Sequence, residues 1–109
     1  MNVKHLMSIA NLRPITLPCP ERKVKGAYIG DLLSWVMGRA CEDNAWITIM
    51  SNSNIVAVAT LADVSCIILA EGVKPDEGVT EIALSKGINI LSSEDSAYGI
   101  ARILSLSGL

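Results

Sequence analysis

Lys25-Gly-Ala-Tyr-Ile-Gly-Asp-Leu-Leu-Ser-Trp-Val-Met-Gly-Arg-Ala40 is the stretch that most directly indicates the fold. It reads as a short strand, a turn at Gly30-Asp31 and an amphipathic helix that runs to about Cys41. Gly30 can adopt backbone angles that other residues avoid. Asp31 can accept hydrogen bonds from the free N–H groups of the first helical turn. One face of the helix is apolar and consists of Leu32, Leu33, Val36, Met37 and Ala40.

Further strands and helices are predicted on both sides of this unit. Short apolar runs predict strands at Ile15–Leu17, Val24–Ile29, Ala45–Met50, Cys66–Leu69 and Ile88–Leu91. Helical spacing predicts helices at Asn2–Asn11, Asn54–Asp63, Val79–Lys86 and Glu94–Leu106. From Tyr28 onward strands and helices alternate. This order predicts an α/β layered domain with a mostly parallel sheet of four to five strands flanked by helices. The 109 residues suffice for one domain, so we expect residues 1–109 to form a single unit.

Two of the predicted helices have informative apolar faces. In the helix 79–86, Val79, Ile82 and Ala83 are expected to point inward, and Gly87 is expected to end the helix. The helix 54–63 is apolar almost all round, from Ile55 to Leu61. Such a helix must be covered on more than one side. It therefore lies in the centre of the domain or meets a second subunit.

Composition excludes several classes of function. The net charge is −2 and no run of basic residues is longer than Arg22-Lys23, so a nucleic-acid partner is not expected. No segment has the roughly 18 apolar residues that a membrane helix needs, and Met1–His5 does not resemble a signal peptide. We therefore expect a cytoplasmic protein. Its three cysteines are too far apart for a zinc or iron–sulfur site, so no metal and no cofactor are predicted.

Polar residues follow the predicted strands and are the candidate ligand-binding residues. Because parallel strands end at one edge of a sheet, these residues should lie together. They offer small side chains and backbone donors, which suit a small polar, anionic or nucleotide ligand held at helix N-termini. The alternative is that these residues have only the structural role of ordinary loop and helix-cap residues. The candidates are Gly30, Asp31, Ser51, Asn52, Ser53, Asn54, Glu71, Gly72, Ser92 and Ser93.

No catalytic residues are predicted. The sequence contains no GxxxxGK[ST] loop, no GxGxxG and no GxSxG elbow. The single histidine, His5, is far in sequence from the polar edge, whereas nucleophilic catalysis requires a nucleophile and a base in contact. The chain is therefore predicted not to be an enzyme.

The runs Gly26–Met37, Ala45–Ile49 and Asn54–Leu61 resemble the DRTGG domain family. The resemblance extends from about Val24 to the C-terminus, although the letters DRTGG do not occur in the chain. This family is similar to the N-terminal domain of HPr kinase/phosphorylase, and it occurs fused to CBS domains in some pyrophosphatases. A stand-alone chain of this size resembles the DRTGG proteins of anaerobic bacteria, which are sometimes encoded near iron hydrogenase subunits. The resemblance implies an α/β layer with a parallel sheet. It implies no kinase activity, because the catalytic phosphate loop of HPr kinase lies in a separate domain.

The leading hypothesis is a non-catalytic regulatory or assembly module that forms a homodimer and senses a small anionic or nucleotide ligand at the strand ends. This hypothesis rests on the apolar helix 54–63, on the absence of a catalytic motif and on the family resemblance. Members of this family are similar to domains that pair as homodimers. The second hypothesis is a ligand sensor at the strand ends, with a nucleotide or another phosphorylated metabolite as effector; a protein-binding module is favoured if no such ligand binds. The third is an enzyme of unknown type, or a subunit whose site is completed by a partner protein.

Overall fold

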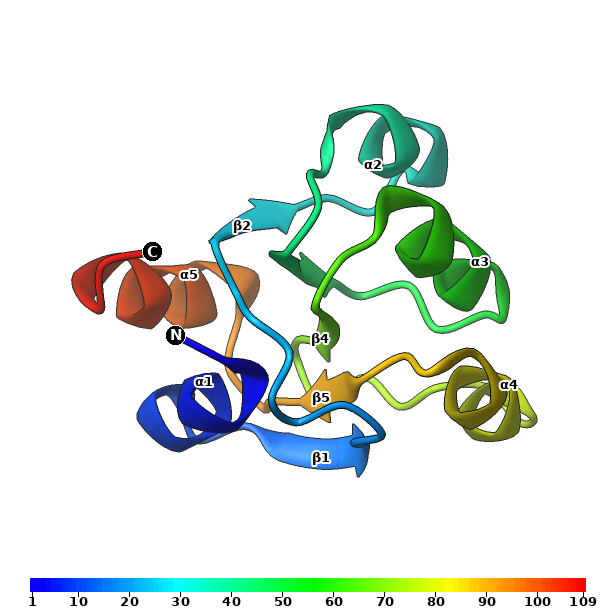
Figure 1. The fold of residues 1–109 in the computed structure, drawn as a ribbon, viewed down its shortest axis with the longest axis horizontal. Coiled ribbons are helices and arrows are strands. Elements are labelled where there is room, and N and C mark those ends of the chain that lie inside the picture. Colours follow the sequence, from blue (N-terminus) through cyan, green and yellow to red (C-terminus); the bar gives the residue numbers. More distant parts are fainter.

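The computed structural model describes residues 1–109 and contains five helices and one five-stranded sheet (Figure 1). The predicted α/β fold with a mostly parallel sheet is confirmed. Most boundaries differ from the predicted ones by one to three residues, as is usual where helix and strand ends are ragged. The helices are α1 (Val3–Ala10), α2 (Leu33–Arg39), α3 (Asn54–Ala62), α4 (Val79–Lys86) and α5 (Ala97–Leu106). The strands are β1 (Arg13–Thr16), β2 (Gly26–Ile29), β3 (Asn44–Thr48), β4 (Cys66–Leu69) and β5 (Ile90–Ser92).

The strands are arranged in the order β1-β5-β4-β3-β2. Strands β2 to β5 are parallel, and β1 pairs antiparallel with β5 at one edge. Strand β1 contains Pro14, which an edge strand tolerates because one side of its backbone needs no partner. At the opposite edge, β2 pairs only with β3, so its outer side is open. Because β1 is antiparallel, its first residue, Arg13, lies opposite Ser92 at the end of β5.

The sheet is covered on both faces, which explains why its central strands are apolar throughout. Helices α1 and α5 lie on one face and helices α2, α3 and α4 on the other (Figure 1). Side chains of β3 and β4 alternate between the two cores. Ala45, Ile47, Cys66 and Ile68 pack toward α1 and α5. Trp46, Ile67 and Leu69 pack toward the other three helices.

Helix α3 is the middle helix of its layer, with α2 on one side and α4 on the other. Ile55, Val56, Val58 and Ala59 are buried against the sheet and these neighbours. A central place in the fold therefore accounts for most of the apolar surface of α3. Only its outer side remains open, where Leu61 is 70% exposed.

One inward-facing prediction is wrong. Ile82 of α4 is 40% exposed, whereas Val79 and Ala83 are buried as expected. These two residues are four apart and lie on one line of the short helix, which suffices to contact the sheet. Ile82 lies to the side of that line and borders a surface groove together with Leu61.

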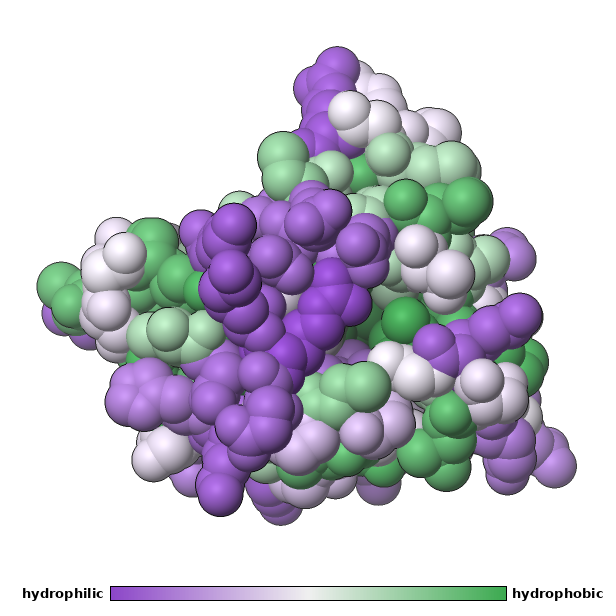
Figure 2. All heavy atoms as spheres, in the orientation of Figure 1, coloured by the Kyte–Doolittle hydropathy of each residue, from purple (hydrophilic) through white to green (hydrophobic).

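The segment from Leu17 to Lys25 connects β1 to β2 across the amino ends of the parallel strands (Figure 1). Within this segment, Arg22 donates to Asp43 Oδ1 (3.2 Å), Asp63 Oδ1 (2.9 Å) and the Asp63 carbonyl (2.8 Å). Burial works against the charged guanidinium, but the hydrogen bonds and charges of Asp63 and Asp43 outweigh it and raise the pKa of Arg22. Figure 2 shows a hydrophilic band over this segment, with more hydrophobic areas over the helices on either side. None of the helices is long and apolar enough to span a bilayer.

Candidate functional site

The candidate residues lie in four loops at the carboxyl edge of the sheet, because β2 to β5 all run in the same direction. Gly30 and Asp31 follow β2, and Ser51 to Asn54 lie between β3 and α3. Glu71 and Gly72 follow β4, Ser92 is the last residue of β5, and Ser93 is the next residue. The prediction that these stretches share an edge rests on the parallel sheet. That they bind a ligand remains a prediction.

Asp31 does not cap helix α2, so its predicted role is wrong. The helix begins two residues later, and Leu32 occupies the N-cap position without a side-chain bond. Instead, Asp31 Oδ1 accepts hydrogen bonds from Thr48 Oγ1 (2.8 Å) and from the backbone N–H of Ile49 (3.1 Å). The carboxylate thus ties the end of β2 to the end of β3.

Gly30 is also explained differently from the prediction. It does not belong to the glycines with a left-handed backbone. A Cβ at this position would lie 2.8 Å from the ring of Tyr28, so any larger residue would require the Tyr28 side chain to move. The Gly30 carbonyl accepts a hydrogen bond from Nε1 of the buried Trp46 (2.9 Å).

The loop after β3 is fixed by bonds between its own polar groups and a neighbouring loop. Ser51 Oγ donates to Asp76 Oδ1 (2.9 Å), and the Asp76 N–H donates to the Ser51 carbonyl (2.9 Å). Asn52 Oδ1 accepts from the N–H of Asn54, the first residue of α3 (2.9 Å). Ser53 occupies the N-cap position but makes no side-chain bond to the helix. The polar side chains here mainly stabilise the loop.

Glu71 and Gly72 form a tight turn, in which both have left-handed backbones (φ 62° and 70°) and the Val73 N–H donates to the Ala70 carbonyl (3.1 Å). The turn is bonded to the loop after β5. The Glu71 N–H donates to the Asp95 carbonyl (2.8 Å), and the Gly72 N–H donates to the Ser93 carbonyl (2.9 Å). The carboxyl ends of β4 and β5 are therefore joined by a fixed backbone bridge.

The connections after β4 and β5 lead to opposite faces of the sheet. After β2, β3 and β4 the chain proceeds to α2, α3 and α4 on one face, but after β5 it proceeds to α5 on the other face (Figure 1). In open α/β sheets, ligands bind outside the carboxyl ends of strands where such a change occurs. The topology therefore favours the β5 end of the edge over the β2 end.

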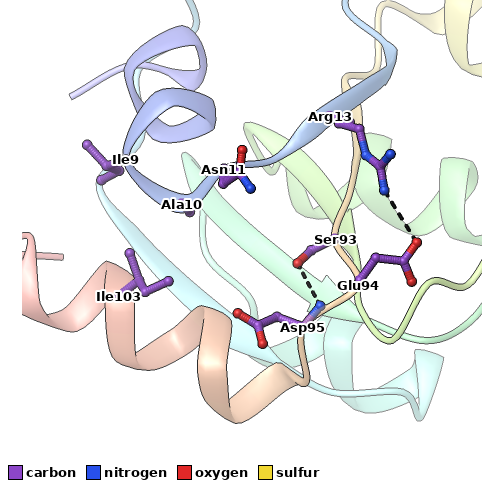
Figure 3. A pocket seen from close by; sticks show the side chains of 8 residues that line it. All are labelled: Ile9, Ala10, Asn11, Arg13, Ser93, Glu94, Asp95 and Ile103. Atoms are coloured by element: carbon purple, nitrogen blue, oxygen red, sulfur yellow. Dashed lines mark hydrogen bonds and ion pairs between the residues drawn. The ribbon is translucent and has the colours of Figure 1, made fainter.

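A hollow of about 450 Å³ lies beside this point, between the end of α1 and the start of α5 (Figure 3). Of the candidate residues it includes only Ser93, which is 7% exposed. The sequence prediction missed the others because β1 was not known to be antiparallel, which is what brings the end of α1 to this edge. Glu94 and Asp95 could have been found, because they directly follow Ser93. The residues lining the hollow are Ile9, Ala10, Asn11, Arg13, Ser93, Glu94, Asp95 and Ile103.

The charges along this edge are mainly negative. The loops carry Asp31, Glu71, Asp76, Glu94 and Asp95, and the basic residues near them are Lys74 and Arg13. Such a field repels a bare polyanion and favours neutral, zwitterionic or cationic groups.

No three His, Cys, Asp or Glu side chains are placed to hold a metal ion. His5 is exposed near the start of α1, beside Glu21 and Lys23 of the connecting segment. Burial raises the pKa of the Cys66 thiol to about 12, so this cysteine is not a thiolate nucleophile.

Comparison with known families gives a match to the DRTGG domain over residues 21–107. The chain belongs to the DRTGG domain family. Comparison with curated proteins finds no match. Among solved structures, the chain is similar to the CBS and DRTGG domains of the regulatory region of Clostridium perfringens pyrophosphatase, a crystal structure complexed with the activator diadenosine tetraphosphate.

That structural likeness has a TM-score of 0.76 at 13% sequence identity, which shows a shared fold. The match covers 94% of this chain but 45% of the pyrophosphatase chain, so this DRTGG chain spans less than half of the regulatory region that it resembles. The matched region is regulatory, and no catalytic domain is part of the match.

Proposed function

We propose that this DRTGG chain is a non-catalytic regulatory or assembly module that responds to a small polar ligand at the carboxyl edge of its sheet. The observation that carries the proposal is the edge between β4 and β5, where a rigid backbone bridge adjoins a hollow lined by polar side chains. Such a site can hold a small polar ligand. The likeness to a regulatory region that binds a nucleotide activator supports the same class of function.

A nucleotide is one ligand to test, although the charges limit how it could bind. The acidic loops oppose its phosphates, so its recognition would have to come from base and ribose contacts. Asp31 offers such a contact, because both of its hydrogen bonds use Oδ1 and leave Oδ2 for a hydroxyl donor.

A thermal-shift panel tests the proposal directly. The panel comprises ATP, ADP, diadenosine tetraphosphate, sugar phosphates, orthophosphate and the twenty amino acids at millimolar concentration. A ligand at about 100 times its Kd adds about 2.7 kcal/mol, which raises Tm by several degrees in a domain of this size. Ser93→Ala should reduce the shift, and Ser85→Ala, on an exposed part of α4, should not. A panel with no selective shift would contradict the ligand-sensing role.

We also propose that the module forms a homodimer through the open edge of β2. Four large apolar side chains near this edge are half-exposed: Ile29 (49%), Leu32 (60%), Trp35 (53%) and Ile49 (47%). An unpaired strand edge next to exposed apolar side chains favours pairing with another chain. A second copy can pair there about a two-fold axis, because each copy presents the same strand.

A further inference from the structure

We propose that the hollow between α1 and α5 binds a free α-amino acid with an aliphatic side chain. The inference rests on the proposed function, because it names the ligand class of the same edge. Figure 3 shows three kinds of group around the hollow. Aliphatic side chains lie at one end, Arg13 and Glu94 lie at the other, and Asn11, Ser93 and Asp95 lie between them.

The aliphatic end suits the side chain of the ligand. It is formed by Ile9 and Ala10 from the last turn of α1 and by Ile103 from α5. Ile9 and Ile103 are only partly buried and belong to the rim of the core. An aliphatic group placed between them would remove apolar surface of both helices from water, which is favourable in proportion to the area covered.

Asp95 suits the ammonium group of the ligand. Its carboxylate is exposed and accepts no hydrogen bond from the chain, whereas its backbone N–H donates to Ser93 Oγ (3.0 Å). The carboxylate lies against the first turn of α5, since a Cβ on Gly99 would be 3.1 Å from it. It has no cationic partner within the chain. The Asn11 side chain likewise makes no hydrogen bond within the chain, so its carbonyl oxygen is a second acceptor for an ammonium group.

Arg13 suits the carboxylate of the ligand. Its Nη2 contacts Glu94 Oε1 at 3.3 Å, and both side chains are more than two-thirds exposed (71% and 76%). An exposed pair of this kind has little net stability. The guanidinium can therefore exchange Glu94 for a ligand carboxylate, to which it can donate two parallel hydrogen bonds.

The backbone of the site requires little rearrangement on binding. The Ser93 carbonyl accepts a hydrogen bond from the Gly72 N–H, and the Ser93 N–H donates to the Leu69 carbonyl (3.0 Å). These two bonds fix the backbone of Ser93. The Asp95 carbonyl is fixed by the Glu71 N–H. With one guanidinium and two carboxylates, the lining accepts a zwitterion more readily than a phosphate ester. The observations together favour an amino acid over a nucleotide at this point of the edge.

Isothermal titration calorimetry of the full chain with L-leucine tests the inference, with three truncated probes for comparison. 3-Methylbutylamine lacks the carboxylate, 4-methylpentanoate lacks the ammonium group, and glycine lacks the side chain. We expect saturable binding of L-leucine and at least about tenfold weaker binding of each truncated probe. Asp95→Asn should weaken L-leucine binding about tenfold or more and should not weaken the binding of 4-methylpentanoate, which has no ammonium group and is repelled by the Asp95 carboxylate.

Two further variants separate a direct contact from a general charge effect. Glu94→Gln releases Arg13 and should strengthen L-leucine binding, whereas Arg13→Gln should weaken it. Glu81 is an exposed acidic residue of α4 outside the hollow, so Glu81→Gln is the matched control and should leave the affinity for L-leucine unchanged. Failure of L-leucine and of the other aliphatic amino acids to bind would overturn the inference, as would binding that Asp95→Asn and Arg13→Gln leave unaltered. If only a nucleotide binds, the proposed function stands and the inference is wrong; if nothing binds, both the ligand-sensing role and the inference are wrong.

Discussion

At the scale of single residues, Arg22 has the largest predicted effect on stability. It is the shared partner of Asp43 and Asp63, and the Asp43 side chain is only 13% exposed. Arg22→Ala leaves this carboxylate without its cation and frees the segment that joins β1 to β2. We expect a loss of about 2–3 kcal/mol in the free energy of unfolding. Urea denaturation of both proteins measures this difference.

Arg13 provides the matched control for that experiment. It forms a single ion pair with Glu94, and both partners are exposed. Arg13→Ala should therefore change the free energy of unfolding by less than about 0.5 kcal/mol. Equal losses for the two arginine variants would contradict a structural role specific to Arg22.

Cys66 makes stability depend on alkaline pH. Burial raises the pKa of its thiol from 9.0 to about 12, although the charge of Arg22 acts in the opposite direction. Below about pH 9 the thiol is protonated in both the folded and the unfolded chain. Above that pH the unfolded chain loses the proton while the folded chain keeps it, so the unfolded state binds fewer protons. The thiol should therefore lower the free energy of unfolding by about 1.4 kcal/mol per pH unit until about pH 12.

Cys66→Ala isolates this contribution. The variant should be less stable than the parent protein at about pH 8, because a buried side chain is truncated. It should lose less stability than the parent between about pH 8 and about pH 10, so the gap between the two proteins narrows. Cys19 and Cys41 are exposed and do not disturb the comparison. If the free energies of unfolding of the two proteins fall in parallel between about pH 8 and about pH 10, the buried thiol does not cause the loss of stability at alkaline pH.

At the scale of secondary structure elements, Asp31 connects two strands rather than starting a helix. Asp31→Ala removes the acceptor for the buried Thr48 hydroxyl and the Ile49 N–H, and should cost about 1–2 kcal/mol. Asp31→Asn keeps a side-chain oxygen and should cost less. In hydrogen exchange, Asp31→Ala should speed exchange of the Ile49 amide while leaving the amides of α2 unaffected. Faster exchange confined to the first turn of α2 would instead support a capping role.

The elements themselves were largely predictable from the sequence, but the contacts at their ends were not. Strand β4 and helix α4 match their predicted limits, because Cys66–Leu69 is a short apolar run and Gly87 ends α4 with a left-handed backbone. The role of Asp31 was missed because a carboxylate before a helix can bond to the helix or to a neighbouring strand, and only tertiary structure decides between them. The direction of β1 has no local signal, so the hollow beside Arg13 could not be predicted.

At the scale of the whole molecule, the distribution of helices explains why one end of the edge is better suited to a ligand. Three consecutive crossovers place α2, α3 and α4 on one face, and α5 alone returns to the other. The chain therefore leaves β4 and β5 toward opposite faces of the sheet, and the hollow lies on the face of α1 and α5, between these two helices. The opposite end of the sheet, at β2, has no such enclosure. It has an open backbone edge instead, which suits a protein partner.

Self-association through the β2 edge has a direct signature in the mass of the protein in solution. If two copies pair through β2, the parent protein should have twice the monomer mass by light scattering at about 100 µM and should dissociate on dilution. Leu32→Glu places a charge on the half-exposed apolar surface beside the edge and should shift the equilibrium to monomer. Leu106→Glu makes the same change at the end of α5, where the leucine is 76% exposed, and should remain dimeric. A monomeric parent protein would contradict dimerisation, and dissociation by both variants would place the interface elsewhere. Thermal unfolding of Leu32→Glu should resemble that of the diluted parent, because a 60% exposed side chain contributes little to the core of one copy.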